Sequence, residues 1–122
     1  MTVMTNTYPH SASYLRFLNL MQAVRTLPVF PSLDALEERL LNVLAASWAQ
    51  DKQITVLTAT ALLDDTSATT VHRRLKSMRS KGLIDLQVDT VDYRVKYVVP
   101  TALTQRYFSE LGACMQKATQ QA

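Results

Sequence analysis

The apolar residues of positions 13–27 recur at the three- and four-residue spacing of an amphipathic helix. Polar side chains occupy the rest of the helix surface. The apolar face comprises Tyr14, Phe17, Leu18, Met21 and Val24, widened by Leu20 and Leu27. Pro28 and Pro31 follow, and proline excludes helix because it lacks an amide hydrogen and clashes with the preceding turn. The pattern therefore predicts one helix that ends near residue 27.

A second apolar helix is predicted directly after the prolines. Ser32 or Asp34 can cap it, and the acidic residues that follow suit the positive end of the helix dipole. Its core-facing positions are Leu36, Leu40, Val43, Leu44 and Ser47, with Leu41 and Trp48 on a second stripe. The polar run 50–53 ends this helix. We expect a very short strand around Ile54 and then a short helix over about 56–63.

The pattern after the acidic turn 64–66 predicts a further helix and a hairpin. The helix extends over about 68–81, with Thr66 or Ser67 as its cap and Gly82 in the left-handed conformation that ends many helices. Alternating apolar residues then predict strands over 83–89 and 93–99, joined by a turn at 90–92. Thr101 caps a last helix that begins near residue 102.

This order of elements predicts a mainly α-helical fold with a small β-wing, a winged helix-turn-helix with extra N- and C-terminal helices. At 122 residues the chain has room for one core. We expect a flexible leader over 1–12, an N-terminal helix and proline linker over 13–31, a winged helix-turn-helix domain over 32–100, and a C-terminal helix over 101–122. The two terminal helices are predicted to mediate dimerisation.

Composition excludes several classes of protein. The leader has neither the basic nor the apolar segment of a signal peptide, and no stretch is apolar enough for a membrane span, so we expect a cytoplasmic protein. Cys114, the single cysteine, is expected to be buried filler. The net charge of +3 is compatible with a polyanionic partner but does not establish one.

The distribution of charge is more informative than its sum. Between positions 67 and 81 there are five basic residues and no acidic one. A basic face alone is usually plain solvated surface, but here a short helix precedes it and a hairpin with basic residues follows. Arginine can contact guanine edges, while lysine and hydroxyl groups hold phosphates. The candidate DNA-contacting residues are Ser67, Thr69, Thr70, His72, Arg73, Arg74, Lys76, Ser77, Arg94 and Lys96.

Several short motifs carry a family resemblance: Thr70-Val71 opening an arginine-containing helix, the ending Lys81-Gly82-Leu83-Ile84, the spacing of Asp89, Asp92 and Arg94, and the cap Thr101. With these motifs, residues 33–111 resemble the winged helix-turn-helix of MarR-type transcriptional regulators. Tyr93 departs from the pattern, because the family usually has a second basic residue there. The chain is also short for the family, so we assign no small-molecule effector, although one is possible, and no cofactor.

The resemblance implies a homodimer, joined by its first and last helices, that represses transcription rather than activating it. It implies that the helix over 67–81 enters the major groove of double-stranded DNA and that the wing over 89–96 meets the minor groove. Thr69, Thr70, Arg73 and Ser77 would approach bases or nearby phosphates, and Arg94 would reach the minor groove. The apolar excess of the terminal helices supports a dimer interface. Its candidates are Tyr14, Phe17, Leu18, Met21, Val24, Tyr107, Phe108, Leu111 and Met115.

An enzyme is not expected. His10 lies in the leader and His72 has no carboxylate at useful helical spacing, so no catalytic residue and no metal site are assigned. Two alternatives to a transcriptional regulator remain: a winged helix that binds another protein, and a DNA-binding protein of plasmid or phage replication or partition. The acid-free run over 67–81 favours DNA, whereas Asp64 and Asp65 just before it would repel phosphates.

Overall fold

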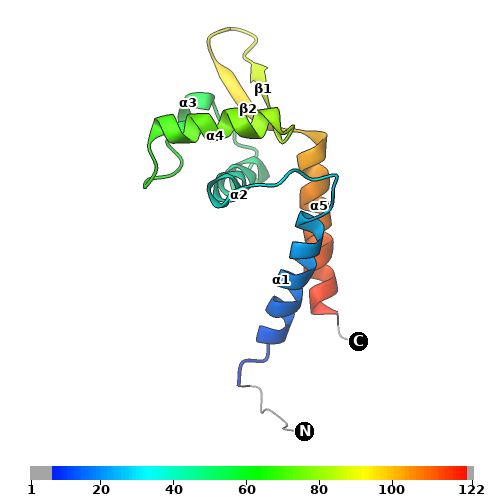
Figure 1. Ribbon diagram of the computed structural model, residues 1–122. Helices are drawn as coiled ribbons and strands as arrows, with labels where there is room; N and C mark the ends of the chain where they lie inside the picture. Colours follow the sequence, from blue (N-terminus) through cyan, green and yellow to red (C-terminus); the bar gives the residue numbers. More distant parts are fainter. Residues whose placement is uncertain (1–6, 121–122) are drawn as a thin grey trace. The chain divides into compact units, whose positions relative to one another are not determined.

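The computed structural model describes residues 7–120 and has the predicted order of elements (Figure 1). In order, these are helices α1 (Ser11–Arg25), α2 (Ala35–Ala49), α3 (Val56–Thr60) and α4 (Ala68–Ser80), strands β1 (Ile84–Val88) and β2 (Lys96–Pro100), and helix α5 (Ala102–Thr119). The mainly helical fold with a small β-wing is thereby confirmed. Of the expected leader, residues 1–6 lie outside the described residues, and 11–12 already belong to α1.

The chain forms two compact units. One combines the segment up to Phe30 with the segment from Arg106 onward, and the other comprises residues 31–105. In the first unit α1 and α5 run antiparallel (Figure 1). The guanidinium group of Arg16 donates hydrogen bonds of 3.1 and 2.8 Å to the carbonyl of Ala118, near the end of α5. At the other end of the pair, the rings of Phe30 and Tyr107 meet edge to face at 5.1 Å.

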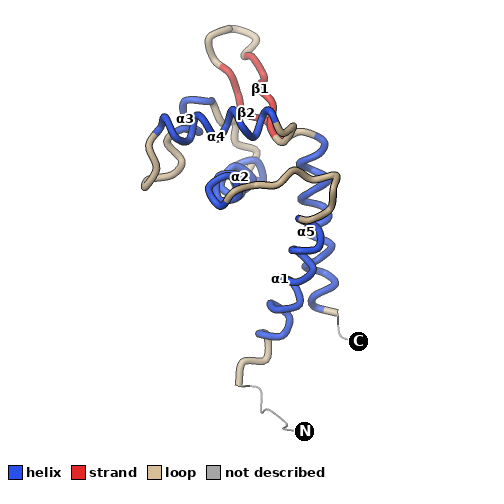
Figure 2. The backbone as a smooth tube through the Cα atoms, viewed as in Figure 1, coloured by secondary structure: helices blue, strands red, loops and turns tan. Residues whose placement is uncertain are grey.

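In the second unit, helices α2, α3 and α4 and a two-stranded antiparallel sheet surround the core (Figure 2). The sheet consists of β1 and β2. The strands pair from Ile84 opposite Pro100 to Val88 opposite Lys96. The predicted short strand at Ile54 is reduced to a single bridge between Thr55 and Tyr97. The core of this unit contains buried apolar side chains from every one of these elements and from the segments that join them: Leu40, Leu41, Leu44, Ile54, Ala59, Leu63, Val71, Leu75, Met78, Leu83, Ile84 and Val98.

Local side-chain hydrogen bonds determine where the helices begin and end. Asp34, not Ser32, caps α2 in a capping box: its carboxylate accepts a hydrogen bond from the amide of Glu37, and its own amide donates one to the Glu37 carboxylate. Ser67, not Thr66, caps α4 by accepting a hydrogen bond from the amide of Thr70. Gly82 has a φ of 81° directly after α4, as the sequence predicts.

The loop of the wing is longer than the predicted turn at 90–92. The carboxylate of Asp89 accepts hydrogen bonds from the amides of Val91 and Asp92, and the Asp89 amide donates to the carbonyl of Val95. The bond between Asp89 and Val95 continues the cross-strand pairing one residue beyond Val88 and Lys96. The two bonds to the Asp89 carboxylate hold the residues between them in a local loop, because an aspartate side chain competes with cross-strand partners for nearby amides. Tyr93 and Arg94, predicted in the second strand, therefore lie in the loop.

A buried ionic network joins α2 to α4. Glu37 is only 2% exposed, and its carboxylate lies 2.7 Å from the ammonium group of Lys81. Ser77 donates a 2.9 Å hydrogen bond to the same carboxylate, and Lys81 also donates to the carbonyl of Ser32. Burial opposes ionisation of Glu37, but the hydrogen bonds from Lys81, Asp34 and Ser77 and the charge of Lys81 outweigh it and lower its pKa. The network fixes the C-terminal half of α4 on the N-terminus of α2.

Replacing Glu37 with Gln should destabilise the protein by about 2 to 4 kcal/mol at pH 7, because it leaves the half-buried Lys81 without its counter-charge. Since the pKa of Glu37 is lowered from 4.5, its contribution is present above about pH 4.5 and is lost as the pH falls toward the folded-state value. Chemical denaturation between pH 3 and 7 measures both effects. The matched control is Asp85→Asn, which removes an exposed carboxylate 3.6 Å from Arg79 and should cost less than about 1 kcal/mol. Equal losses in the two variants would contradict a structural role for the network.

Candidate nucleic-acid interface

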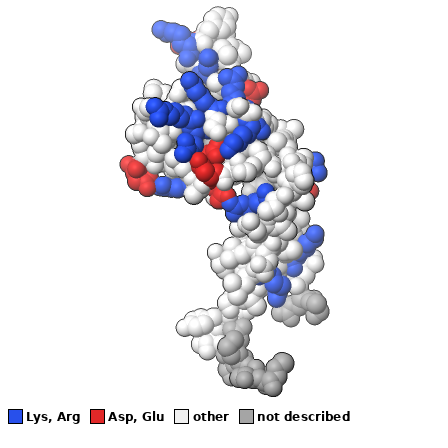
Figure 3. Space-filling model, viewed as in Figure 1, with Lys and Arg blue, Asp and Glu red and all other residues white. Residues whose placement is uncertain are grey.

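Helix α4 divides into a buried face and a polar face. Val71, Leu75 and Met78 are buried against the rest of the second unit. The opposite side exposes four of the predicted DNA-contacting residues, Thr69, His72, Arg73 and Lys76. Basic side chains gather over α4 and the wing (Figure 3). Among the described residues, Arg73 and Lys76 have no ion-pair partner within the protein, so their charges are available to a ligand.

Four other predicted residues of this helix are engaged within the protein. Ser67 and Thr70 form the N-terminal cap, and their hydroxyl groups are hydrogen-bonded to each other at 2.9 Å. Arg74 points toward α2, where its Nε lies 2.9 Å from a carboxylate oxygen of Asp34, and Ser77 is bonded to Glu37. The structure therefore does not bring Arg74 and Ser77 to the exposed polar face. Both occupy the α2-facing flank because α4 packs on α2 through this side.

The wing contributes two more predicted residues. Arg94 is 90% exposed, and its guanidinium lies 3.1 Å from the carboxylate of Asp92 in the same loop. The hydrogen bonds that Arg94 donates lower the pKa of Asp92, so that carboxylate is ionised at neutral pH. Lys96 begins β2, where it is exposed and pairs with Val88 across the sheet. The loop thus presents one arginine at its tip and one lysine at its base.

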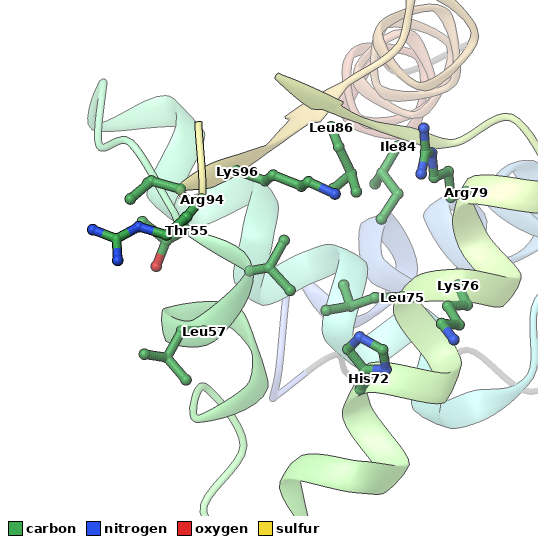
Figure 4. A pocket seen from close by; sticks show the side chains of 12 residues that line it. Thr55, Leu57, His72, Leu75, Lys76, Arg79, Ile84, Leu86, Arg94 and Lys96 are labelled. Atoms are coloured by element: carbon green, nitrogen blue, oxygen red, sulfur yellow. The ribbon is translucent and has the colours of Figure 1, made fainter. Parts of the chain in front are cut away.

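A hollow of about 590 Å³ lies between α3, α4 and the wing (Figure 4). Its apolar lining includes Leu75, Ile84, Leu86 and the largely exposed Leu57, and its polar lining includes His72, Lys76, Arg79, Arg94 and Lys96. The hollow therefore brings predicted residues of the helix and of the wing around one concave, basic surface. Such a surface suits a polyanion whose backbone crosses from one element to the other.

Two residues of this face were missed by the sequence analysis. Arg79 lines the hollow, and its spacing from His72 and Lys76, seven and three residues on, could have placed it on the same helical face. Arg39 of α2 lies 2.8 Å from the carboxylate of Asp65 in the acidic turn before α4. It neutralises one of the two acidic residues expected to repel phosphates. No local pattern reveals that contact, since the two residues are 26 positions apart.

Within residues 7–120, histidine, cysteine and acidic side chains do not come together in groups of three that could hold a metal ion. None of the helices in this range is both long and apolar enough to cross a membrane.

Comparisons with known proteins show the fold. No family model and no curated protein sequence matches the chain. Among solved structures, a transcriptional regulator from Thermotoga maritima superposes with a TM-score of 0.59 at 12% identity, over 86% of this chain and 66% of that protein. The chain thus spans slightly less than two thirds of the length of that regulator.

Two further structures are similar. The heme sensor protein PefR from Streptococcus agalactiae, solved with heme, has a TM-score of 0.57 at 18% identity, over 93% of this chain and 76% of that protein. The DNA-binding protein BpsR from Bordetella bronchiseptica has a TM-score of 0.52 at 16% identity, over 98% of this chain and 81% of that protein. The chain therefore has the MarR-like winged-helix fold of transcriptional regulators, as the sequence resemblance predicted.

Proposed function

We propose that the protein is a sequence-specific regulator of transcription that binds double-stranded DNA in the cytoplasm, with α4 in the major groove and the wing at the adjacent minor groove. The basic hollow between α4 and the wing carries the proposal. Neighbouring grooves of a duplex are separated by one sugar–phosphate strand, and a concave surface with Lys76, Arg79 and Lys96 suits that strand in position and charge.

The likeness of fold supports DNA as the partner. A solved structure of BpsR concerns how 6-hydroxynicotinic acid regulates its DNA binding. For the present chain we propose DNA alone, with neither an effector nor a catalytic role. Repression is favoured over activation by the resemblance to MarR-type regulators.

We assign the exposed residues of α4 to base or phosphate contacts by their position along the helix. Thr69 and Arg73 lie in the first two turns, the part of a reading helix that reaches base edges, so we assign them to base contacts. Lys76 lies further along and also lines the hollow, so we assign it to phosphate. On the wing, Arg94 is assigned to the minor groove and Lys96 to the phosphate strand beside it.

We further propose that the protein acts as a homodimer joined by α1 and α5. No side chain of α1 is buried within the chain, and Tyr14 and Leu15 are 60% and 58% exposed. On α5, Met115 is 59% exposed, while Phe108 and Leu111 are half-buried. Tyr107, also predicted at the interface, is instead 8% exposed because it packs on Phe30. An apolar surface of this kind usually marks an interface, and a two-fold dimer would present two reading helices to a palindromic site.

The first prediction concerns salt dependence. The logarithm of the affinity for duplex DNA should fall by about 0.9 per neutralised phosphate for each unit of log salt, and Lys76→Ala should reduce that slope by about one on every sequence. Fluorescence anisotropy with labelled random duplex between 50 and 300 mM salt measures it. Lys117→Ala, which removes a lysine from the last turn of α5, is the control and should leave the slope unchanged. A flat salt dependence of the unaltered protein would contradict DNA binding and favour a protein-binding winged helix.

A second prediction concerns specificity. Arg73→Ala should weaken binding to the best site found by selection from random duplexes by about 1 to 3 kcal/mol and relax the preference at one base position. Selection repeated with the variant reveals the relaxed position. If Arg73 holds only phosphate, specific and random DNA will lose equal affinity, and the assignment to a base contact is wrong.

A third prediction concerns assembly. Sedimentation at micromolar concentration should give a dimer of the 13.7 kDa chain, and the double variant Tyr14→Glu, Leu15→Glu should give a folded monomer with weakened operator binding. Both side chains are largely exposed in the single chain, so their loss spares its core. Ala23→Glu adds one such charge at another exposed position of α1 and serves as the control. A monomeric unaltered protein would rule out the interface.

A further inference from the structure

The tip of the wing presents apolar side chains to solvent. Val91 is 88% exposed and Tyr93 is 77% exposed, and both lie in the loop that joins β1 to β2 and projects beyond the sheet (Figure 1). Arg94, the next residue, is 90% exposed. Two large apolar residues within three positions, beside an exposed guanidinium group that pairs with Asp92, make an unusual combination for a solvated turn, where polar residues dominate.

The backbone beneath these side chains is held in place. Asp89 accepts hydrogen bonds from the amides of Val91 and Asp92, at 3.0 and 2.8 Å, and from the hydroxyl of Tyr97 at 3.0 Å. The carboxylate of Asp92 in turn accepts from the amide of Arg94 at 3.1 Å, and the backbone carbonyl of Asp92 accepts from the amide of Val95. The tip therefore presents Val91 and Tyr93 from a fixed backbone, which lowers the entropy lost when they contact a ligand.

The charges of the tip indicate the kind of ligand. Both acidic residues of the loop are used internally, Asp89 by backbone amides and Asp92 by Arg94. The tip presents to solvent the side chain of Arg94 and two apolar side chains, Val91 and Tyr93, which flank Asp92 in the sequence. Lys96 follows at the base of the wing. Proteins that bind the minor groove combine these two features, with basic side chains in the groove and apolar side chains wedged against or between base pairs.

We infer that Val91 and Tyr93 form an apolar wedge that enters the minor groove beside Arg94, partly unstacks one base step and bends the DNA. The inference rests on the proposed function, since it concerns how the wing contacts the same duplex. Unstacking costs least at pyrimidine–purine steps such as TA and CA. The wing should therefore add a sequence preference through deformability, at a position where the protein donates no hydrogen bond to a base edge.

The experiment uses the full chain and its best selected site. Energy transfer between dyes at the duplex ends reports the bend, and 2-aminopurine placed in turn at each step reports unstacking. The unaltered protein should bend the duplex and brighten 2-aminopurine at one step under the wing. The double variant Val91→Ser, Tyr93→Ser should abolish both signals and weaken binding by about tenfold, with the salt slope unchanged because no phosphate contact is lost.

Matched variants separate a wedge from other contacts. Tyr93→Phe keeps the ring and should keep the bend, whereas Tyr93→Arg should lose the bend and steepen the salt slope by about one. The thermal midpoint should be unchanged in all of them, since both side chains are exposed. A double serine variant that retains the bend, or that lowers the salt slope, would overturn the wedge while leaving DNA binding intact. An unaltered protein without salt-dependent DNA binding would instead refute the proposed function.

Discussion

The position of α4 depends on a carboxylate buried between two helices. Glu37 accepts hydrogen bonds from Lys81 and Ser77 and completes the cap of its own helix with Asp34, so one side chain ties the start of α2 to the second half of α4. A buried charge tolerates little displacement, because each lost partner leaves a costly unsatisfied group. The polar face of α4 is therefore presented from a fixed helix, as the proposed contact with base edges requires.

Ion pairs within the protein determine which charges remain exposed around this fixed helix. Asp34 forms an ion pair with Arg74 on the side of α4 that faces α2. Arg39 forms an ion pair with Asp65 and neutralises this carboxylate next to the start of α4. Arg73 and Lys76 remain on the exposed side, and the hollow beside them joins the helix to the basic residues of the wing. Internal pairing thus removes charges from one flank of α4 and leaves unpaired cations where a duplex would lie.

The first unit buries few side chains. Its α1 buries no side chain, while α5 buries Tyr107, Cys114 and Ala118. Hydrogen bonds from Arg16 to the end of α5 and the contact of Phe30 with Tyr107 align the two helices at both ends, yet leave apolar surface along them. In the proposed homodimer, a second copy of the chain would cover this surface.

The sequence by itself determined the type and order of the elements, because helix and strand periodicity, caps such as Ser67 and the left-handed turn at Gly82 depend on neighbouring residues. It also indicated the basic face of α4. Only the tertiary structure decided which residues of that face stay exposed. Ser77 meets Glu37 across 40 positions of the chain, and Tyr107 is buried by Phe30. Such contacts follow from the packing of distant segments, which no local pattern encodes.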